Sequence, residues 1–279
     1  MNNVVVIQPT TSLFRFNFRE LWEFRSLVWL FAKRDIFIVY KQTVFGPLWF
    51  VIQPVMMSVV FATVFGRIAQ INTGGIPHII FFMSGFVVWN FFTAVTNQTA
   101  GSLRSNSNIF SKVWFPRLVL PVAAVLTNLA HFALGVVIFL VFYIVVLLKG
   151  AVMAPTLWLA ALPLLVLHIA CVGLGVGMWV AAVSVKYRDL GFALPVVMQI
   201  WMFSSPVIYA MEGVVDPLFR KIMFCNPMAA PLELFRLAFL GVGTANPAAI
   251  AVSCAITLVV FVTGLAAFNK AQRNFVDIG

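Results

Sequence analysis

The residues of this chain that could carry out chemistry are few and do not converge. The sequence has no G-x-x-x-x-G-K-[ST] phosphate loop, no G-x-G-x-x-G turn after a strand and no G-x-S-x-G around a nucleophilic serine. The candidate acids and bases, Asp35, Asp189, Glu212 and Asp216, are split between the two sides expected for a membrane protein. The sequence therefore predicts neither a nucleotide site nor a catalytic centre, and no cofactor of the chain's own.

The histidines and cysteines are isolated as well: His78, His131, His168, Cys171, Cys225 and Cys254. Their spacing indicates neither a zinc site nor a disulfide framework. We expect the histidines to be hydrogen-bonded inside a helix bundle and the cysteines to serve as small apolar side chains.

Aromatic and amide side chains are the remaining candidates, since Phe, Trp and Tyr make up 15% of the chain. Ring faces can contact the C–H faces of sugars while amides exchange hydrogen bonds with hydroxyls. The residues expected to line such a path are Phe86, Trp89, Asn90, Gln199, Trp201 and Tyr209. The alternative for each aromatic is a place against lipid or neighbouring helices, and Phe91 is expected to face lipid.

Six long apolar stretches must position these residues. They contain no Asp, Glu, Lys or Arg and run approximately 45–66, 77–100, 118–148, 155–185, 190–210 and 248–268. Each reaches the roughly 20 residues that a helix needs to cross a bilayer. They lack the alternation of a membrane barrel. With 62% hydrophobic and 9% charged residues, the sequence predicts one all-α, polytopic membrane domain over residues 1–279 with six transmembrane helices.

The basic residues give an orientation. Thirteen of the 18 Lys and Arg fall in segments on one side of the six stretches, and five fall on the other. Basic residues concentrate on the cytoplasmic side of membrane proteins, so both termini are expected in the cytoplasm. The net charge of +10 thus indicates a membrane orientation and no nucleic-acid partner.

Leu13 to Arg34 has helical periodicity with an aromatic face and a basic face. Such a helix is expected to lie in the cytoplasmic headgroup layer as an anchor. Lys33, Arg34, Asp35 and Lys41 continue its polar strip, so a surface for a cytoplasmic partner is the alternative.

The outer segment Met211 to Pro247 has two helix-start signals, Asp216-Pro217 and Asn226-Pro227. The second helix should end near Gly241 or Gly243, too short to span. We expect a re-entrant hairpin shielded by protein, with Glu233 and Arg236 paired at i and i+3; a loop lying on the surface is the alternative.

The loop after the second stretch begins with a turn at Ser105 to Asn108, continues as a short helix from Ile109 to Phe115 and stops at Pro116. Exposed aromatics on a short helix are typical of a projection that fits a groove on another protein. Contact with lipid headgroups is the alternative.

Several motifs, in order along nearly the whole chain, resemble the type-2 ATP-binding-cassette polysaccharide exporter permeases that export O-antigen, capsule or teichoic acid chains on a lipid carrier. They are Tyr40 to Trp49 running into Gln53-Pro54, Lys112 to Pro121, Val185 to Asp189, and Ser205 to Tyr209 followed by Asn226-Pro-Met228.

The resemblance implies a permease in the bacterial inner membrane. It implies a homodimer bound to two copies of a separate ATPase subunit, which holds ATP and Mg, with a lipid-linked polysaccharide as substrate. ATPase coupling would fall on Asn108, Ile109, Phe110, Lys112, Trp114, Phe115 and Arg117. The lipid pyrophosphate at the cytoplasmic mouth would meet Arg34, Arg117, Lys186 or Arg188. A membrane glycosyl- or acyltransferase and an ion-coupled carrier are the competing classes.

Overall fold

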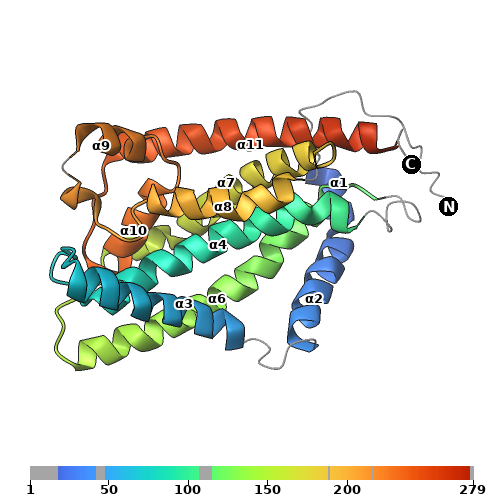
Figure 1. The fold of residues 1–279 in the computed structure, drawn as a ribbon. Coiled ribbons are helices and arrows are strands. Elements are labelled where there is room, and N and C mark those ends of the chain that lie inside the picture. The colour runs from blue at the N-terminus through green and yellow to red at the C-terminus, as the bar shows by residue number, and fades with distance from the viewer. Residues whose placement is uncertain (1–17, 42–47, 107–114, 188, 215, 277–279) are drawn as a thin grey trace.

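A computed structural model describes residues 18–41, 48–106, 115–187, 189–214 and 216–276. These residues form helices and connecting turns, with no β-strand among them. In Figure 1 the long helices run side by side, and the chain passes back and forth between the two ends of the bundle. The helices are α1 (Phe18–Glu23), α2 (Arg25–Lys41), α3 (Leu48–Phe61), α4 (His78–Ser105), α6 (Val119–Leu148), α7 (Leu162–Ser184), α8 (Leu190–Phe203), α9 (Pro217–Phe224), α10 (Ala229–Leu240) and α11 (Pro247–Val276).

Helix α4 occupies the centre of the bundle. It is apolar nearly all round, and a helix with that composition is expected to be buried on all sides. Of its most apolar 18 residues 78% are buried, against 22–33% for α6, α7 and α11. Its Phe81, Phe82 and Phe92 are among the largest fully buried side chains described. Helix α4 is therefore the core around which the others pack.

Small residues allow the closest helix contacts. A Cβ at Gly177 of α7 would lie 2.6 Å from the Cβ of Thr99 of α4, and one at Gly175 would lie 2.9 Å from the backbone of Phe261 of α11. No side chain fits at either position without displacing a neighbour. These glycines therefore allow α4, α7 and α11 to approach closely.

Four of the described helices are long and apolar enough to cross a membrane: His78–Ser105, Val119–Leu148, Leu157–Ser184 and Pro247–Gln272. They match the second, third, fourth and sixth apolar stretches. The first stretch appears as α3 with a π-helical continuation over Ala62–Ile68, and the fifth as α8; both are shorter.

The prediction that 190–210 is one continuous helix is wrong. Helix α8 ends at Phe203, and Ser204 to Ala210 is largely irregular. Pro206 has no N–H to donate and disfavours helical geometry at Ser205, so the helix cannot continue through this segment.

The amphipathic N-terminal segment also differs from expectation. Its described part is two helices that meet at Phe24, and it continues to Lys41, past Arg34. Helix α2 lies across the axes of the long helices at the end where α4 stops and α6 starts (Figure 1). Val28, Phe31 and Ala32 are buried against Val119, Leu120 and Ala123 of α6, whereas Trp22 and Trp29 are exposed. The predicted apolar face therefore packs on protein, and Trp22 and Trp29 lie on the exposed surface.

Helix α9 begins as expected, whereas the predicted start of the second helix at Asn226-Pro227 is wrong: α10 begins at Ala229, its N-cap is Met228, and no side chain caps it. Asp216 Oδ1 accepts the backbone N–H groups of Leu218 and Phe219, and Asn226 Oδ1 accepts that of Met228. Helix α10 ends at Gly241, whose φ of 73° lies in the left-handed region. Eleven of the 12 residues of α10 are buried. It is enclosed by protein, while Leu218 and Ile222 of α9 are exposed.

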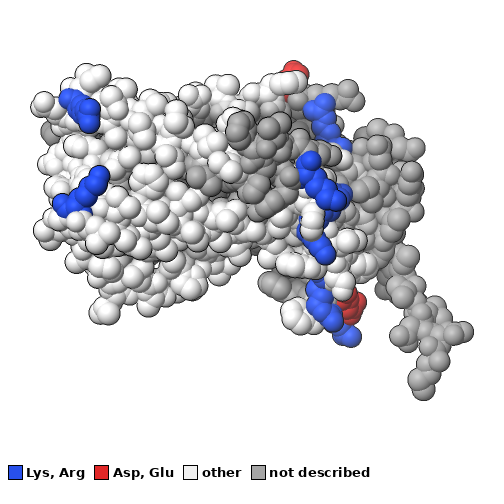
Figure 2. Space-filling view, turned by 90° about the horizontal axis from the view of Figure 1, so that it is seen from below, with Lys and Arg blue, Asp and Glu red and all other residues white. Residues whose placement is uncertain are grey.

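Charge separates along the bundle. Figure 2 shows one face on which Lys and Arg gather in a band near one end and appear again at the other, with uncharged surface between. An uncharged belt between charged ends is the surface that a bilayer requires.

Candidate functional site

A groove lies between α3, α4 and α6, with about 250 Å³ of space. Its polar lining residues are Gln53, Asn90, Thr93, Asn97, Asn128 and His131. Asn90, Thr93 and Asn97 are spaced i, i+3, i+7, which places them on one face of α4. Asn97 is exposed although it lies within an apolar helix. The site is therefore a polar strip inside the membrane-crossing part of the bundle.

No Asp, Glu, Lys or Arg is among the groove's lining residues. Its amides and hydroxyl both donate and accept hydrogen bonds, and Phe91 and Phe132 add apolar surface. Polar groups facing hydrocarbon without partners are costly, so this strip needs water, a polar ligand or another protein surface. Its chemistry suits a molecule with many hydroxyls, because amides and hydroxyls exchange hydrogen bonds with them.

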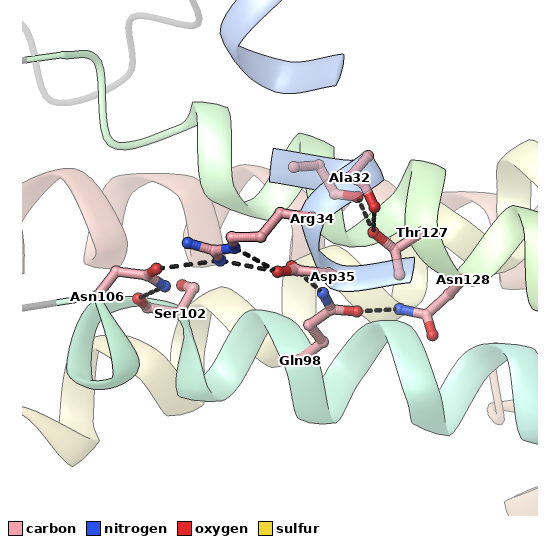
Figure 3. A network of polar contacts seen from close by, with 9 residues as sticks. Ala32, Arg34, Asp35, Gln98, Ser102, Asn106, Thr127 and Asn128 are labelled. Carbon is pink, nitrogen blue, oxygen red and sulfur yellow. Dashed lines mark hydrogen bonds and ion pairs between the residues drawn. The ribbon is translucent and has the colours of Figure 1, made fainter. Parts of the chain in front are cut away.

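One end of the groove connects to α2 through a hydrogen-bonded network (Figure 3). Gln98 Nε2 donates to Asp35 Oδ2 at 2.9 Å, and Asn128 Nδ2 donates to Gln98 Oε1 at 2.6 Å. Arg34 contacts Asp35 Oδ1 with Nη2 at 2.8 Å and Nε at 2.9 Å. Residues from α2, α4 and α6 are thereby joined.

Arg34 makes two further contacts. Its Nη2 donates to Asn106 Oδ1 at the end of α4 at 3.3 Å, and its guanidinium carbon lies 4.7 Å from the Phe31 ring centroid. Phe31 in turn packs on Phe115, with ring centroids 5.5 Å apart. Aromatic and cation–π contacts therefore extend the network to the start of the segment before α6.

The described basic residues among those assigned to a lipid pyrophosphate, Arg34, Arg117 and Lys186, lie at the same end of the bundle. Arg117 Nη1 donates to the Gln272 carbonyl at 2.7 Å, and burial lowers the pKa of its guanidinium, which remains protonated at neutral pH. Lys186 is exposed, with Nζ 5.2 Å from the Tyr187 ring centroid. Arg188 lies outside the described residues. Arg34 and Arg117 thus already have partners within the chain.

The residues expected to line a path separate into two groups. Asn90 lines the groove and Gln199 is exposed on α8. Phe86 and Trp89 are buried in the core: Phe86 packs on Phe61, and Trp89 packs edge-on against Trp201. Trp201 Nε1 donates to Asn226 Oδ1, and Tyr209 Oη donates to the Phe203 carbonyl. Phe86 and Trp89 therefore belong to the packed interior, which was the alternative for each aromatic.

The structure corrects the expected position of Phe91. The expectation that it faces lipid is wrong, because it is 2% exposed and its ring centroid lies 4.8 Å from that of Phe132. A helix that is apolar nearly all round gives no periodicity from which its lipid-facing side can be identified.

The residues assigned to ATPase coupling fall mostly outside the described residues: Asn108, Ile109, Phe110, Lys112 and Trp114. Phe115 and Arg117 are described. The expectation that Phe115 is an exposed anchor is wrong, because it is 5% exposed and packs on Phe31 of α2. Its partner comes from the chain itself.

The predicted pair of Glu233 and Arg236 is confirmed at 3.7 Å and is buried, with side chains 2% and 1% exposed. Arg236 Nη1 also donates to the carbonyls of Pro206 at 2.6 Å and Tyr209 at 3.2 Å. These bonds satisfy backbone groups of the irregular segment after α8. A buried charge is tolerated where it is paired and hydrogen-bonded in this way.

Sequence reasoning missed Gln53 and Asn128 as groove residues. Each is a single amide within an apolar helix, and an amide in such a helix was the available signal. Their approach to Asn90 depends on how α3, α4 and α6 pack, which no local pattern specifies.

The chain matches known proteins over most of its length. A family model described as ABC-2 type transporter matches residues 26–240. An O-antigen export system permease protein, RfbA, of Myxococcus xanthus is 26% identical over 93% of this chain and 97% of its own. The protein of that name from Klebsiella pneumoniae is 26% identical over 91% and 95%. The polysialic acid transport protein KpsM of Escherichia coli is 20% identical over 86% and 91%.

Proposed function

Because this chain belongs to the ABC-2 type transporter family, we propose that it is the permease subunit of a system that exports a lipid-linked polysaccharide across the bacterial inner membrane. The observation that carries the proposal is similarity over nearly the full length to permeases named for O-antigen export, which makes an O-antigen the best candidate polymer. The chain has no phosphate loop, and in such systems the ATPase, which binds ATP and Mg, is a separate subunit.

The groove between α3, α4 and α6 supports a sugar substrate. Its amides and its hydroxyl are groups that exchange hydrogen bonds with the hydroxyls of a sugar. Ion-coupled carriers place ionisable groups in the membrane, whereas the six apolar stretches contain no Asp, Glu, Lys or Arg.

In the proposed arrangement α3, α4, α6, α7, α8 and α11 cross the membrane and both termini are cytoplasmic. Helices α1 and α2 lie in the inner headgroup layer, and α9 and α10 form a re-entrant hairpin at the outer side. Two copies would pair about a two-fold axis to enclose a conduit. Exposed apolar side chains of α3 and α8, among them Met56, Val60, Val196 and Ile200, are available for that contact.

The coupling segment would be Asn108 to Arg117, between α4 and α6. Trp114, next to Phe115, would meet the ATPase, while Phe115 would transmit the contact to α2 through Phe31. At the same end, Lys186 and Arg188 would receive the lipid pyrophosphate. Arg34 and Arg117 would contribute only by exchanging their present partners.

The proposal is tested in the native host by replacing the phosphate-loop lysine of the ATPase subunit. Surface polysaccharide should disappear while the proton gradient, measured with a dye, stays intact. The purified chain alone should not hydrolyse ATP. Export that continues with the inactive ATPase would rule out this function and favour an ion-coupled carrier.

A further inference from the structure

One side chain of the groove has an orientation that its own helix fixes. The Ala124 carbonyl, one turn before Asn128 on α6, can only accept a hydrogen bond, so the atom of Asn128 that lies 2.8 Å from it must be Nδ2. The same Nδ2 donates to Gln98 Oε1 of α4 at 2.6 Å. Both amide hydrogens of Asn128 are therefore engaged within the bundle.

The other end of this amide, Oδ1, is left for the groove. Asn128 is 5% exposed and is one of the groove's lining residues. None of the described residues donates a hydrogen bond to its Oδ1, and Figure 3 shows this end of the amide turned away from Gln98. An amide oxygen only accepts hydrogen bonds, and a buried polar atom without a partner is costly. Oδ1 therefore requires a hydrogen-bond donor from a molecule in the groove.

The other amides of the groove are adaptable. They belong to Gln53 of α3 and to Asn90 and Asn97 of α4, and no hydrogen bond joins any of them to another described residue. Each can turn to donate or to accept. A hydroxyl group does both, so it can donate to Asn128 Oδ1 and accept from one of these amides. A sugar unit with several hydroxyls therefore matches the fixed acceptor and the adaptable amides together.

We propose that Asn128 is a substrate-binding residue of the permease, whose Oδ1 accepts a hydrogen bond from a hydroxyl of the exported polysaccharide in the groove between α3, α4 and α6. This inference rests on the proposed function and names a contact for its substrate. The other candidate occupants, a phospholipid and a second copy of this chain, are outcomes of the test.

A photoreactive residue identifies the occupant. p-Benzoylphenylalanine, which forms bonds to nearby C–H groups, is placed at position 97, an exposed lining residue of the groove. The comparison site is Val141, which is 55% exposed on α6 and is not a lining residue. Exporting cells are irradiated, and the purified permease is probed with antiserum against the polymer. Position 97 should give a ladder of polymer-bearing permease that is absent from cells unable to make the polymer, and position 141 should give none.

The variant Asn128→Leu tests the proposed contact. Leucine has nearly the same shape as asparagine but has no oxygen to accept a hydrogen bond. With the photoreactive residue at position 97 and permease levels matched, the variant should lower the yield of the ladder about fivefold, the scale of one hydrogen bond. Surface polymer from the same variant without the photoreactive residue should fall in parallel.

Two control variants separate this contact from packing. Thr127→Val is nearly isosteric and changes the buried residue before Asn128, which donates to the Ala123 carbonyl and does not line the groove. Gln98→Met removes the contact of Asn128 Nδ2 with α4, whereas the Ala124 carbonyl still holds Nδ2 and leaves Oδ1 in place. Both controls should leave the ladder and the surface polymer close to those of the parent chain.

The absence of a ladder at position 97 in exporting cells would overturn the inference, as would a product that contains only lipid or a second permease. An undiminished ladder from Asn128→Leu would exclude the Oδ1 contact. An equal loss in either control, or an Asn128→Leu chain that fails to accumulate, would show that the side chain serves packing and would also overturn the inference. Failure of the proposed function is a different result: surface polymer in wild-type cells would then not depend on the permease or on the ATPase.

Discussion

At the residue scale, the buried charges of α10 are held by backbone groups as well as by each other. Arg236 pairs with Glu233 and donates to the carbonyls of Pro206 and Tyr209, and its guanidinium carbon lies 3.9 Å from the Phe81 ring centroid. Glu233 Oε2 accepts from the Thr244 backbone N–H at 3.2 Å. The pair therefore connects α10 to the segments on either side of it.

Arg236→Met should lower the free energy of unfolding by about 3–5 kcal/mol, because it leaves the Glu233 charge buried without its cation. Denaturant titration of the purified chain in detergent measures the change. Glu233→Leu, Arg236→Met should be less harmful than Arg236→Met alone, since both charges are removed. Arg220→Met, at an exposed position of α9, should change stability by less than about 0.5 kcal/mol. Equal effects of Arg236→Met and Arg220→Met would contradict this account.

At the element scale, α7 is held between α4 and α11 by residues without side chains. The Cβ positions of Gly175 and Gly177 are filled by Phe261 of α11 and Thr99 of α4. Because lipid tails are as apolar as the helices, helix association in a bilayer depends on such close packing. Helix α7 therefore joins the outer helix α11 to the central helix α4.

Gly177→Ala should destabilise the bundle by about 1–3 kcal/mol, because the added methyl would lie 2.6 Å from Thr99 Cβ. Gly101→Ala is the matched control: its methyl would meet the Ser105 hydroxyl at 3.6 Å, an ordinary contact. The thermal midpoint of each purified variant gives the comparison. If Gly177→Ala is as stable as Gly101→Ala, the close approach of α4 and α7 is not a requirement of the fold.

At the scale of the whole molecule, the charged ends and the uncharged belt define how the bundle sits in a bilayer. Helix α2, the end of α4 and the start of α6 meet at one end, and α9 and α10 lie at the other (Figure 1). The sequence assigns thirteen of 18 basic residues to segments at the first end. We expect that end to face the cytoplasm.

Single cysteines in a cysteine-free background test this orientation. Cysteines at positions 107 and 272 should react with a membrane-impermeant maleimide only in inverted vesicles, and those at 72 and 246 should react in intact cells. Permeabilised cells, in which all four positions should react, are the control. Labelling of position 107 in intact cells would contradict the expected orientation and indicate the opposite one.

Assembly with the ATPase is tested at Trp114. Trp114→Ala should reduce co-purification of the ATPase subunit by a hot-spot effect, on the order of 2 kcal/mol, while the permease still inserts. Val141→Ala, at a residue 55% exposed on α6, is the control. If the Trp114→Ala permease still assembles fully with the ATPase subunit, the loop contacts only lipid headgroups and the ATPase-contact proposal is wrong.

The sequence by itself determined the helical membrane class, the four long helices, the N-cap of α9 and the glycine end of α10. These features depend on residues within one helical turn or on the apolar length of one segment. They can therefore be predicted without knowing which distant segments pack against them. The end of α8 was also encoded locally, at Pro206, although the apolar composition of 190–210 obscured it.

Only the tertiary structure decided which faces are buried. Helix α4 is apolar nearly all round, so its sequence could not distinguish buried Phe91 from a lipid-facing residue. The local pattern around Phe115 predicts exposure because its partner, Phe31, lies on a distant segment. Gln98 meets Asp35 and Asn128 across 63 and 30 residues of chain. Such pairs depend on helix rotation and crossing, which arise from the packing of all the helices together.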